Sequence, residues 1–260
     1  MSAIGAAYSE AAPAWAEGPA RVYDRLAGLL VDLAPVEIAG RLVLDVGAGT
    51  GAASRAIERA GGWAVACDLA LGMLAADRAH RPSAVVADAR ALPLADRSVG
   101  GVVAAFALNH VPDPQVALAE AARVTAAGGF VLVSSYAEDD DHPVKAAVDT
   151  AAAEEGWAQS DWYDDLRAGS MPRLATADGA WSAARAAGLI RADAAVVDVP
   201  MPELDVRDLL AWRLGLVHLA PFIEAGGSER RRRVAARALE LLGDDPPPLV
   251  RRMVVLRAVL

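Results

Sequence analysis

The stretch VLDVGAGTG, residues 43–51, decides the fold of this chain. A short apolar run enters a turn with glycines at 47, 49 and 51, and a helical pattern leaves it. Glycines there let the chain bend sharply and let a ligand approach the backbone, and the following helix offers unpaired N–H groups. We therefore predict a ligand-binding strand–loop–helix unit. A tight turn without a ligand is the alternative, and the flanking strand and helix patterns disfavour it.

Strand and helix patterns continue to alternate outward from this loop. We predict strands at 42–46, 63–67, 84–87, 99–107 and 129–135, with helices at 51–60, 71–80 and 114–125. The segment 145–187 is helical, 194–199 is a strand, 205–242 forms two or three helices, and 249–259 is a last strand. Runs that are apolar on both faces suit strands covered by helices on both sides. The alternation predicts a doubly wound, mostly parallel α/β sheet.

Acidic residues end the first three predicted strands. Asp68 lies 21 residues after Gly47, where a carboxylate can accept both hydroxyls of a ribose. A helix N-cap is the alternative role for Asp68. Asp88 can accept from an exocyclic amine such as that of adenine. Asp45 precedes a GxGxG loop, not the GxGxxG of dinucleotide enzymes. A pyrophosphate would be repelled by this acid, whereas a ligand with an ammonium group and an adenosine would be attracted by all three.

These residues, the stretch FALNHV at 106–111 and EAARVTAAGG at 120–129 resemble the class I S-adenosylmethionine-dependent methyltransferases. Within that family, the resemblance is to the branch of ubiquinone/menaquinone C-methyltransferases and small-molecule methyltransferases of secondary metabolism. It covers roughly residues 40–136. The resemblance implies a seven-stranded sheet with an antiparallel final hairpin, and S-adenosyl-L-methionine as cofactor. Gly100 and Ala126-Ala127 depart from the family, which often has Asp and Lys-Pro there.

The resemblance also implies a set of cofactor-binding residues. Gly47, Ala48, Gly49 and Gly51 would lie along the methionine moiety with Asp45 beneath, Asp68 at the ribose, Leu69 and Met73 against the adenine, Asp88 and Ala89 at its edge, Phe106, Ala107 and Val111 near the sulfonium, and Tyr8 near the carboxylate. We expect one domain over 1–260, with a helical lead-in or lid at 1–39, a cofactor core at 40–136, and helical substrate caps at 137–180 and 201–248.

The methyl group of a sulfonium is already activated, so alignment of the reacting atoms can supply most of the acceleration. A protein base is needed only where the acceptor is protonated at rest. Three histidines are candidates for such a base: His110, which follows the fourth strand, His142, and His218. For each, a structural role is the alternative. His80, late in a predicted helix, is expected at the surface.

Composition excludes several classes of protein. The 260 residues carry a net charge of −9, which disfavours binding to nucleic acid. The longest apolar or glycine run is at 99–108, too short for a membrane span of about 20 residues. The single cysteine and the lack of a ligand cluster predict no metal site. With no signal sequence apparent, we expect a cytoplasmic protein, as a monomer or homodimer.

The favoured function is O-, N- or C-methylation of a small, largely apolar metabolite. Three alternatives remain: a cyclase or isomerase that keeps the cofactor pocket, a nicotinamide-dependent oxidoreductase, and a methyltransferase acting on macromolecules. Only three of the thirteen aromatic residues, Trp63, Phe106 and Phe130, lie between residue 40 and Tyr136. If the others line a cleft, the acceptor is an apolar or planar molecule.

Overall fold

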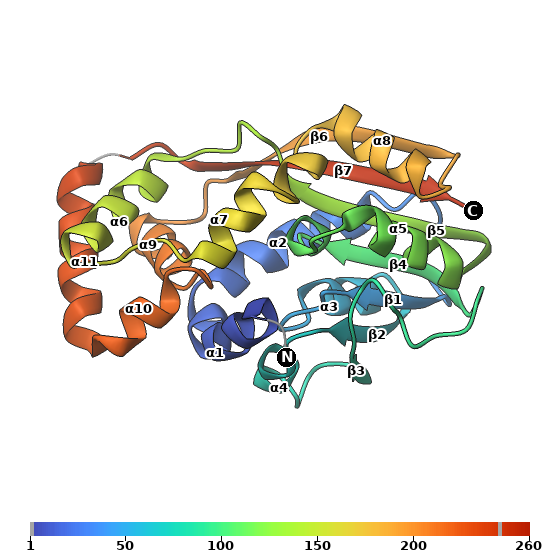
Figure 1. Ribbon diagram of the computed structural model, residues 1–260, viewed down its shortest axis with the longest axis horizontal. Helices are drawn as coiled ribbons and strands as arrows, with labels where there is room; N and C mark the ends of the chain where they lie inside the picture. The colour runs from blue at the N-terminus through green and yellow to red at the C-terminus, as the bar shows by residue number, and fades with distance from the viewer. Residues whose placement is uncertain (1–2, 244–245) are drawn as a thin grey trace.

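The computed structural model describes residues 3–243 and 246–260, whose strands form one seven-stranded sheet flanked by helices (Figure 1). The strand order is β3-β2-β1-β4-β5-β7-β6. The strands are β1 (Leu42–Val46), β2 (Trp63–Asp68), β3 (Ala84–Val86), β4 (Val99–Ala105), β5 (Thr125–Tyr136), β6 (Ala192–Met201) and β7 (Leu249–Val259). The first five run parallel, and β7 lies antiparallel between β5 and β6. The predicted sheet and its antiparallel final hairpin are confirmed.

The helices fall into a lead-in, a set of crossovers and two later groups. They are α1 (Ala3–Glu17), α2 (Pro19–Asp32), α3 (Ala52–Arg59), α4 (Leu71–Ala76), α5 (Pro114–Val124), α6 (Pro143–Glu154), α7 (Asp161–Ala168), α8 (Ala177–Ala186), α9 (Val206–Leu214), α10 (Ala220–Ala225) and α11 (Gly227–Leu242), with short 3₁₀ helices η1 (Leu108–His110) and η2 (Met171–Leu174). Figure 1 shows α6 and α9–α11 stacked beyond the carboxyl ends of the parallel strands.

Successive side chains of the central strands enter different cores, because a strand alternates its faces. Val103 joins the core formed with α2 and α3, while its neighbours Val102 and Ala104 join the core formed with α5 and α8. Phe130 and Val131 divide in the same way on β5. Both faces of the sheet are therefore buried, which explains the continuous apolar runs in the sequence.

Two predicted elements end two or more residues earlier than expected. The helix predicted at 71–80 stops at Ala76, because Asp77 turns aside to pair with Arg55 (3.0 Å) and the Arg81 side chain donates to the carbonyl oxygen of Leu74. The strand predicted at 99–107 stops at Ala105, because Phe106 takes a positive φ of 55° and η1 follows.

Candidate functional site

A cavity of about 190 Å³ opens at the carboxyl ends of β1, β2 and β4, beneath helix α1. The strands β2 and β3 lie on one side of β1, and β4 and β5 lie on the other. The order of strands in the sheet therefore changes direction at β1, and ligands of open α/β sheets bind at such a switch point. Four groups of residues line the cavity: Ile4, Gly5, Tyr8, Trp15, Tyr23 and Ala27 from α1 and α2; 45–50 with Ala52 and Ala53; 67–70 with Met73; and 87–90 with 105–108 and 110–112.

The glycine loop after β1 forms the floor of this cavity. Gly47 has a φ of 69°, and a Cβ there would come within 2.2 Å of the Ala107 Cβ, so no larger residue fits. Gly49 also has a positive φ, 55°, and faces Met73. The amides of Gly47 and Ala48 donate to the carbonyl oxygen of Cys67 at 2.7 and 3.0 Å. These bonds fix the loop against the end of β2.

Asp68 connects that loop to the next helix. One carboxylate oxygen accepts from the Gly49 amide at 2.8 Å and the other from the Ala70 amide at 2.7 Å. Burial raises the pKa of this carboxyl, and the two backbone donors oppose that shift. The lone pairs that remain on both oxygens can accept a pair of vicinal hydroxyls.

Asp88 lies further along the same edge, at the end of β3. The Arg90 guanidinium pairs with it at 2.7 Å and lowers the pKa of its carboxyl. Both residues line the cavity. Asp88 is therefore a fixed anionic group at the side of the cavity, able to accept from an amine.

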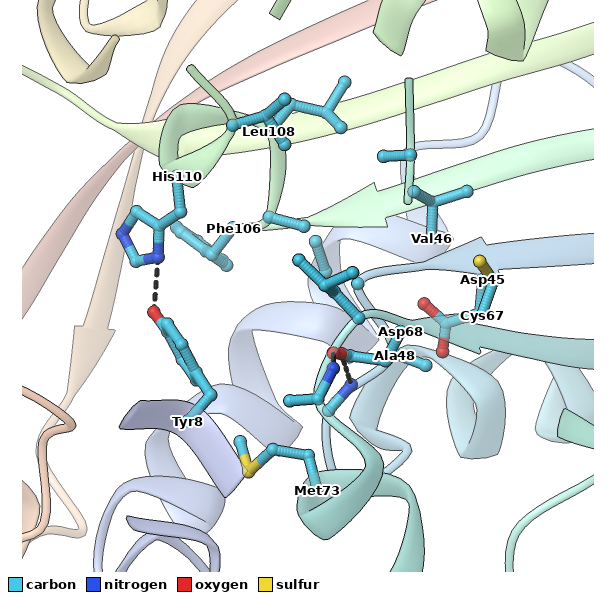
Figure 2. A pocket seen from close by; sticks show the side chains of 18 of the residues that line it. Tyr8, Asp45, Val46, Ala48, Cys67, Asp68, Met73, Phe106, Leu108 and His110 are labelled. Atoms are coloured by element: carbon cyan, nitrogen blue, oxygen red, sulfur yellow. Dashed lines mark hydrogen bonds between the residues drawn. The ribbon is translucent and has the colours of Figure 1, made fainter. Parts of the chain in front are cut away.

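Asp45 lies fully buried under the glycine loop (Figure 2). Its Oδ2 accepts from the Ser54 hydroxyl at 2.6 Å, but its Oδ1 has no hydrogen-bond partner among the described residues. Burial raises the pKa of Asp45 to about 7. A buried carboxylate oxygen without a donor is costly. The site therefore fits a ligand that brings a cationic or donor group to this end of the cavity.

The pKa of Asp45 gives the cofactor-free protein a testable pH dependence. The folded pKa of about 7 exceeds the unfolded value of about 3.9. Between these values the folded state keeps a proton that the unfolded state releases, so stability falls as pH rises, by at most about 1.4 kcal/mol per unit. Asp45→Asn removes this slope. In thermal melts we expect the variant to unfold a few degrees above wild type at pH 8, with a smaller gap at pH 5. Parallel pH curves would contradict this assignment.

The wall opposite Asp45 is aromatic and holds a tyrosine–histidine pair. The Tyr8 hydroxyl on α1 forms a side-chain hydrogen bond with Nδ1 of His110 on η1 (Figure 2). Burial lowers the pKa of His110 to about 4 and raises that of Tyr8 well above 10. Both groups are therefore neutral near pH 7. Trp15 and Tyr23 pack together at 4.6 Å, and Tyr23 contacts Phe106 edge-on at 5.6 Å.

The structure brings most of the predicted site residues together. Those that line the cavity are Tyr8, Asp45, Gly47, Ala48, Gly49, Asp68, Leu69, Met73, Asp88, Ala89, Phe106, Ala107, Val111 and His110. Gly51 lies outside the lining and precedes α3 with a φ of 88°. His142 caps α6, accepting from the Val144 amide and bonding to the Pro247 carbonyl oxygen. His218 also lies outside the lining, and it stacks on Tyr163 at 4.3 Å.

Several lining residues were not predicted from the sequence, among them Ile4, Arg90 and Ala105. The helical spacing of the sequence could have identified Ile4, since it falls on one face of a helix together with Tyr8 and Trp15. Arg90 carried no comparable pattern in the sequence. Its role depends on its pairing with Asp88.

Residues 3–243 and 246–260 lack two features that would change this view of the site. No helix there is both long enough and apolar enough to cross a membrane. Over the same ranges, no three His, Cys, Asp or Glu side chains gather in a way that could hold a metal ion.

Comparison with known proteins agrees with this geometry. Residues 44–133 match a family model described as a methyltransferase domain. That segment runs from β1 to β5 and contains the acid-lined glycine loop, so this part of the chain is similar to a methyltransferase domain. The match supports S-adenosylmethionine as the cofactor of the site.

Two relatives are particularly similar. The chain is 43% identical over 97 residues to the demethylmenaquinone methyltransferase of Mycolicibacterium paratuberculosis, covering 37% of this chain and 42% of that one. It is 36% identical over 138 residues to the Mycobacterium tuberculosis enzyme, covering 53% of each. The chain thus matches about half the length of these relatives.

Among solved structures, a methyltransferase assigned to an antibiotic biosynthesis pathway of Anabaena variabilis superposes with a TM-score of 0.63. It covers 91% of this chain and 97% of that one at 17% identity. At that identity the likeness concerns the fold alone.

Proposed function

We propose that the protein transfers a methyl group from S-adenosylmethionine to a small, largely apolar acceptor, by O-, N- or C-methylation. The observation that carries this proposal is the acid-lined glycine loop: Asp68 is hydrogen-bonded to the loop, and the unpaired Asp45 oxygen lies beneath it. When bound, the cofactor supplies an activated methyl group. Demethylmenaquinone methyltransferases match 37% to 53% of the chain, which favours an acceptor of that planar, lipophilic kind.

Each end of the cavity has a separate task in this proposal. The glycine loop and Asp45 would lie against the charged amino-acid part of the cofactor, Asp68 would hold the ribose, and Asp88 the adenine amine. Met73 would pack against the adenine ring. Phe106, held at a φ of 55° that few non-glycine residues adopt, would lie at the reacting end.

We assign to His110 the role of the base that interacts with the proton of the acceptor group. Its imidazole is neutral at pH 7, and with its Nδ1–H donating to the Tyr8 hydroxyl oxygen, Nε2 is free to accept a hydrogen bond from an acidic acceptor group. Tyr8 is a positioning residue, since its hydroxyl holds the imidazole and ties the lid helix to the site. The aromatic rings around the pair exclude water and favour a planar acceptor.

The remaining assignments follow from the same proposal. Segment 1–39 acts as the lid, 40–136 as the cofactor core, and 137–180 with 201–248 as the substrate cap. We propose action in the cytoplasm, as a monomer or homodimer, without nucleic-acid or membrane partners.

Calorimetric titration with S-adenosylmethionine, S-adenosylhomocysteine and NAD tests this function. We expect micromolar binding of both sulfur ligands and no heat with NAD. A second experiment follows labelled methyl transfer to a panel that includes 1,4-naphthohydroquinone, kept reduced, and 2-naphthol. NAD binding without a response to either sulfur ligand would overturn the proposal. Binding with rearrangement, but no methylation, of an acceptor would favour a non-methylating enzyme.

A further inference from the structure

Arg251 on β7 is a cation held deep inside the protein. Arg251 is 2% exposed, and its guanidinium carbon lies 3.9 Å from the ring centre of Tyr136 and 4.5 Å from that of Trp212. The two rings contact the guanidinium by cation–π interaction. We call Arg251, Tyr136 and Trp212 the Arg251 cluster.

The charge around this cluster is not balanced by its acidic neighbour. Nε and Nη2 of Arg251 donate to Asp140 at 3.0 and 2.7 Å. Lys145 donates to the same carboxylate at 2.9 Å. Two cations therefore share one buried carboxylate, since the side chain of Asp141, 3.9 Å from Lys145, is 84% exposed. The site keeps a net positive charge that an anion would neutralise.

The cluster also contains donors without acceptors. Nη1 of Arg251 and Nε1 of Trp212 are buried and have no hydrogen-bond partner among the described residues. A buried donor without an acceptor destabilises the folded protein, and a charged donor does so more strongly. A purely structural ion pair would explain the Asp140 contacts but not the free Nη1. What the cluster lacks is an acceptor atom.

The cluster lies next to the reacting end of the cofactor cavity. The Tyr136 ring packs on Phe106 at 4.5 Å and meets Tyr23 edge-on at 6.2 Å. Phe106 and Tyr23 both line the cavity. Arg251 and Trp212 do not line the cavity, and the Tyr136 ring contacts both Phe106 and the guanidinium, so an acceptor lying against Phe106 would reach Arg251 past the Tyr136 side chain.

We propose that the Arg251 cluster is an acceptor subsite for an acidic oxygen, such as a phenolate, enolate or carboxylate, carried by a planar ring. This inference rests on the proposed function, because it specifies the acceptor of the same site. A charged guanidinium with a free N–H binds such an oxygen, and the aromatic side chains of Phe106 and Tyr23 favour a planar ring beside it.

Two matched probes test the subsite: 2-naphthoate, and 2-naphthamide, which has the same shape without the charge. Calorimetry is run with and without S-adenosylhomocysteine. We expect the carboxylate to bind about 10-fold more tightly than the amide, as a charged hydrogen bond predicts. Arg251→Met should remove this preference, while Asp140 keeps Lys145 as its partner. Trp212→Phe keeps the ring without the donor and should reduce the preference by several-fold.

Arg257→Met is the matched control, because Arg257 lies on the same strand but pairs at the surface with Asp193. It should leave both affinities unchanged. Equal binding of the two probes by wild type, or a preference that survives both cluster variants, would overturn the inference. Failure to bind S-adenosylhomocysteine would instead overturn the proposed function, and the titrations without that ligand still report the preference.

Discussion

Gly49→Arg should abolish cofactor binding while leaving the fold intact. Gly49 has a φ of 55°, which a side chain rarely adopts, and its amide donates to Asp68 on the inner side of the loop. An arginine side chain there would fill the space between the loop and Met73 and place a cation where the cofactor's own cationic end should lie. We expect the Kd for S-adenosylhomocysteine to rise at least about 100-fold, equivalent to about 2.7 kcal/mol, by calorimetry.

The matched control for this variant is Gly188→Arg. Gly188 also has a positive φ, 87°, and nothing lies within 4 Å of the point that a Cβ would occupy there, so the change imposes similar backbone strain far from the cavity. It should lower the melting temperature without changing the Kd. Wild-type affinity in Gly49→Arg, or equal loss in both variants, would show that the glycine loop does not hold the cofactor.

The glycine loop and the sheet could be predicted from sequence because their determinants are local. Gly47 follows β1 directly and has a positive φ, which favours glycine at that turn. Asp68 ends β2, the next strand along the chain. Periods of two and 3.6 residues then give the alternation of strands and helices. Parallel strands bring their carboxyl ends to one edge, so strand order along the chain is enough to place the acids at these ends together.

The assignment among the histidines could not be made in the same way. His110, His142 and His218 each occur near an expected strand end or helix, and nothing in their neighbours distinguishes them. The contact that distinguishes His110 from the other two histidines is its hydrogen bond with Tyr8, which lies 102 positions away in the sequence. Likewise, Arg251 is one of several arginines in a strand pattern. Its burial against Tyr136 and Trp212 depends on how α9 and β5 pack around it.

His110→Ala should reduce methyl transfer far more than cofactor binding. The variant removes the neutral base that we assign to the acceptor, and general acid–base groups contribute about 10²–10⁴-fold to rates. We expect kcat for 2-naphthol or 1,4-naphthohydroquinone to fall at least about 100-fold, with the Kd for S-adenosylhomocysteine changed less than about threefold. Tyr8→Phe removes one buried hydrogen bond but keeps the ring, so its kcat should fall by about 10-fold.

Substitutions at two other histidines, His80 and His218, test whether the loss of activity is specific to His110. His80→Gln is the control, since the exposed His80 side chain pairs with Asp77 away from the cavity, and its kcat should match wild type. His218→Ala should lower stability, because it empties a buried space beside Tyr163, without a selective loss of kcat. If His110→Ala keeps its activity while His218→Ala loses it at unchanged cofactor affinity, the base lies on the cap side of the site. If Tyr8→Phe weakens cofactor binding as strongly as it slows transfer, Tyr8 contacts the cofactor directly. Its bond to His110 then serves to close the lid and not to position the base.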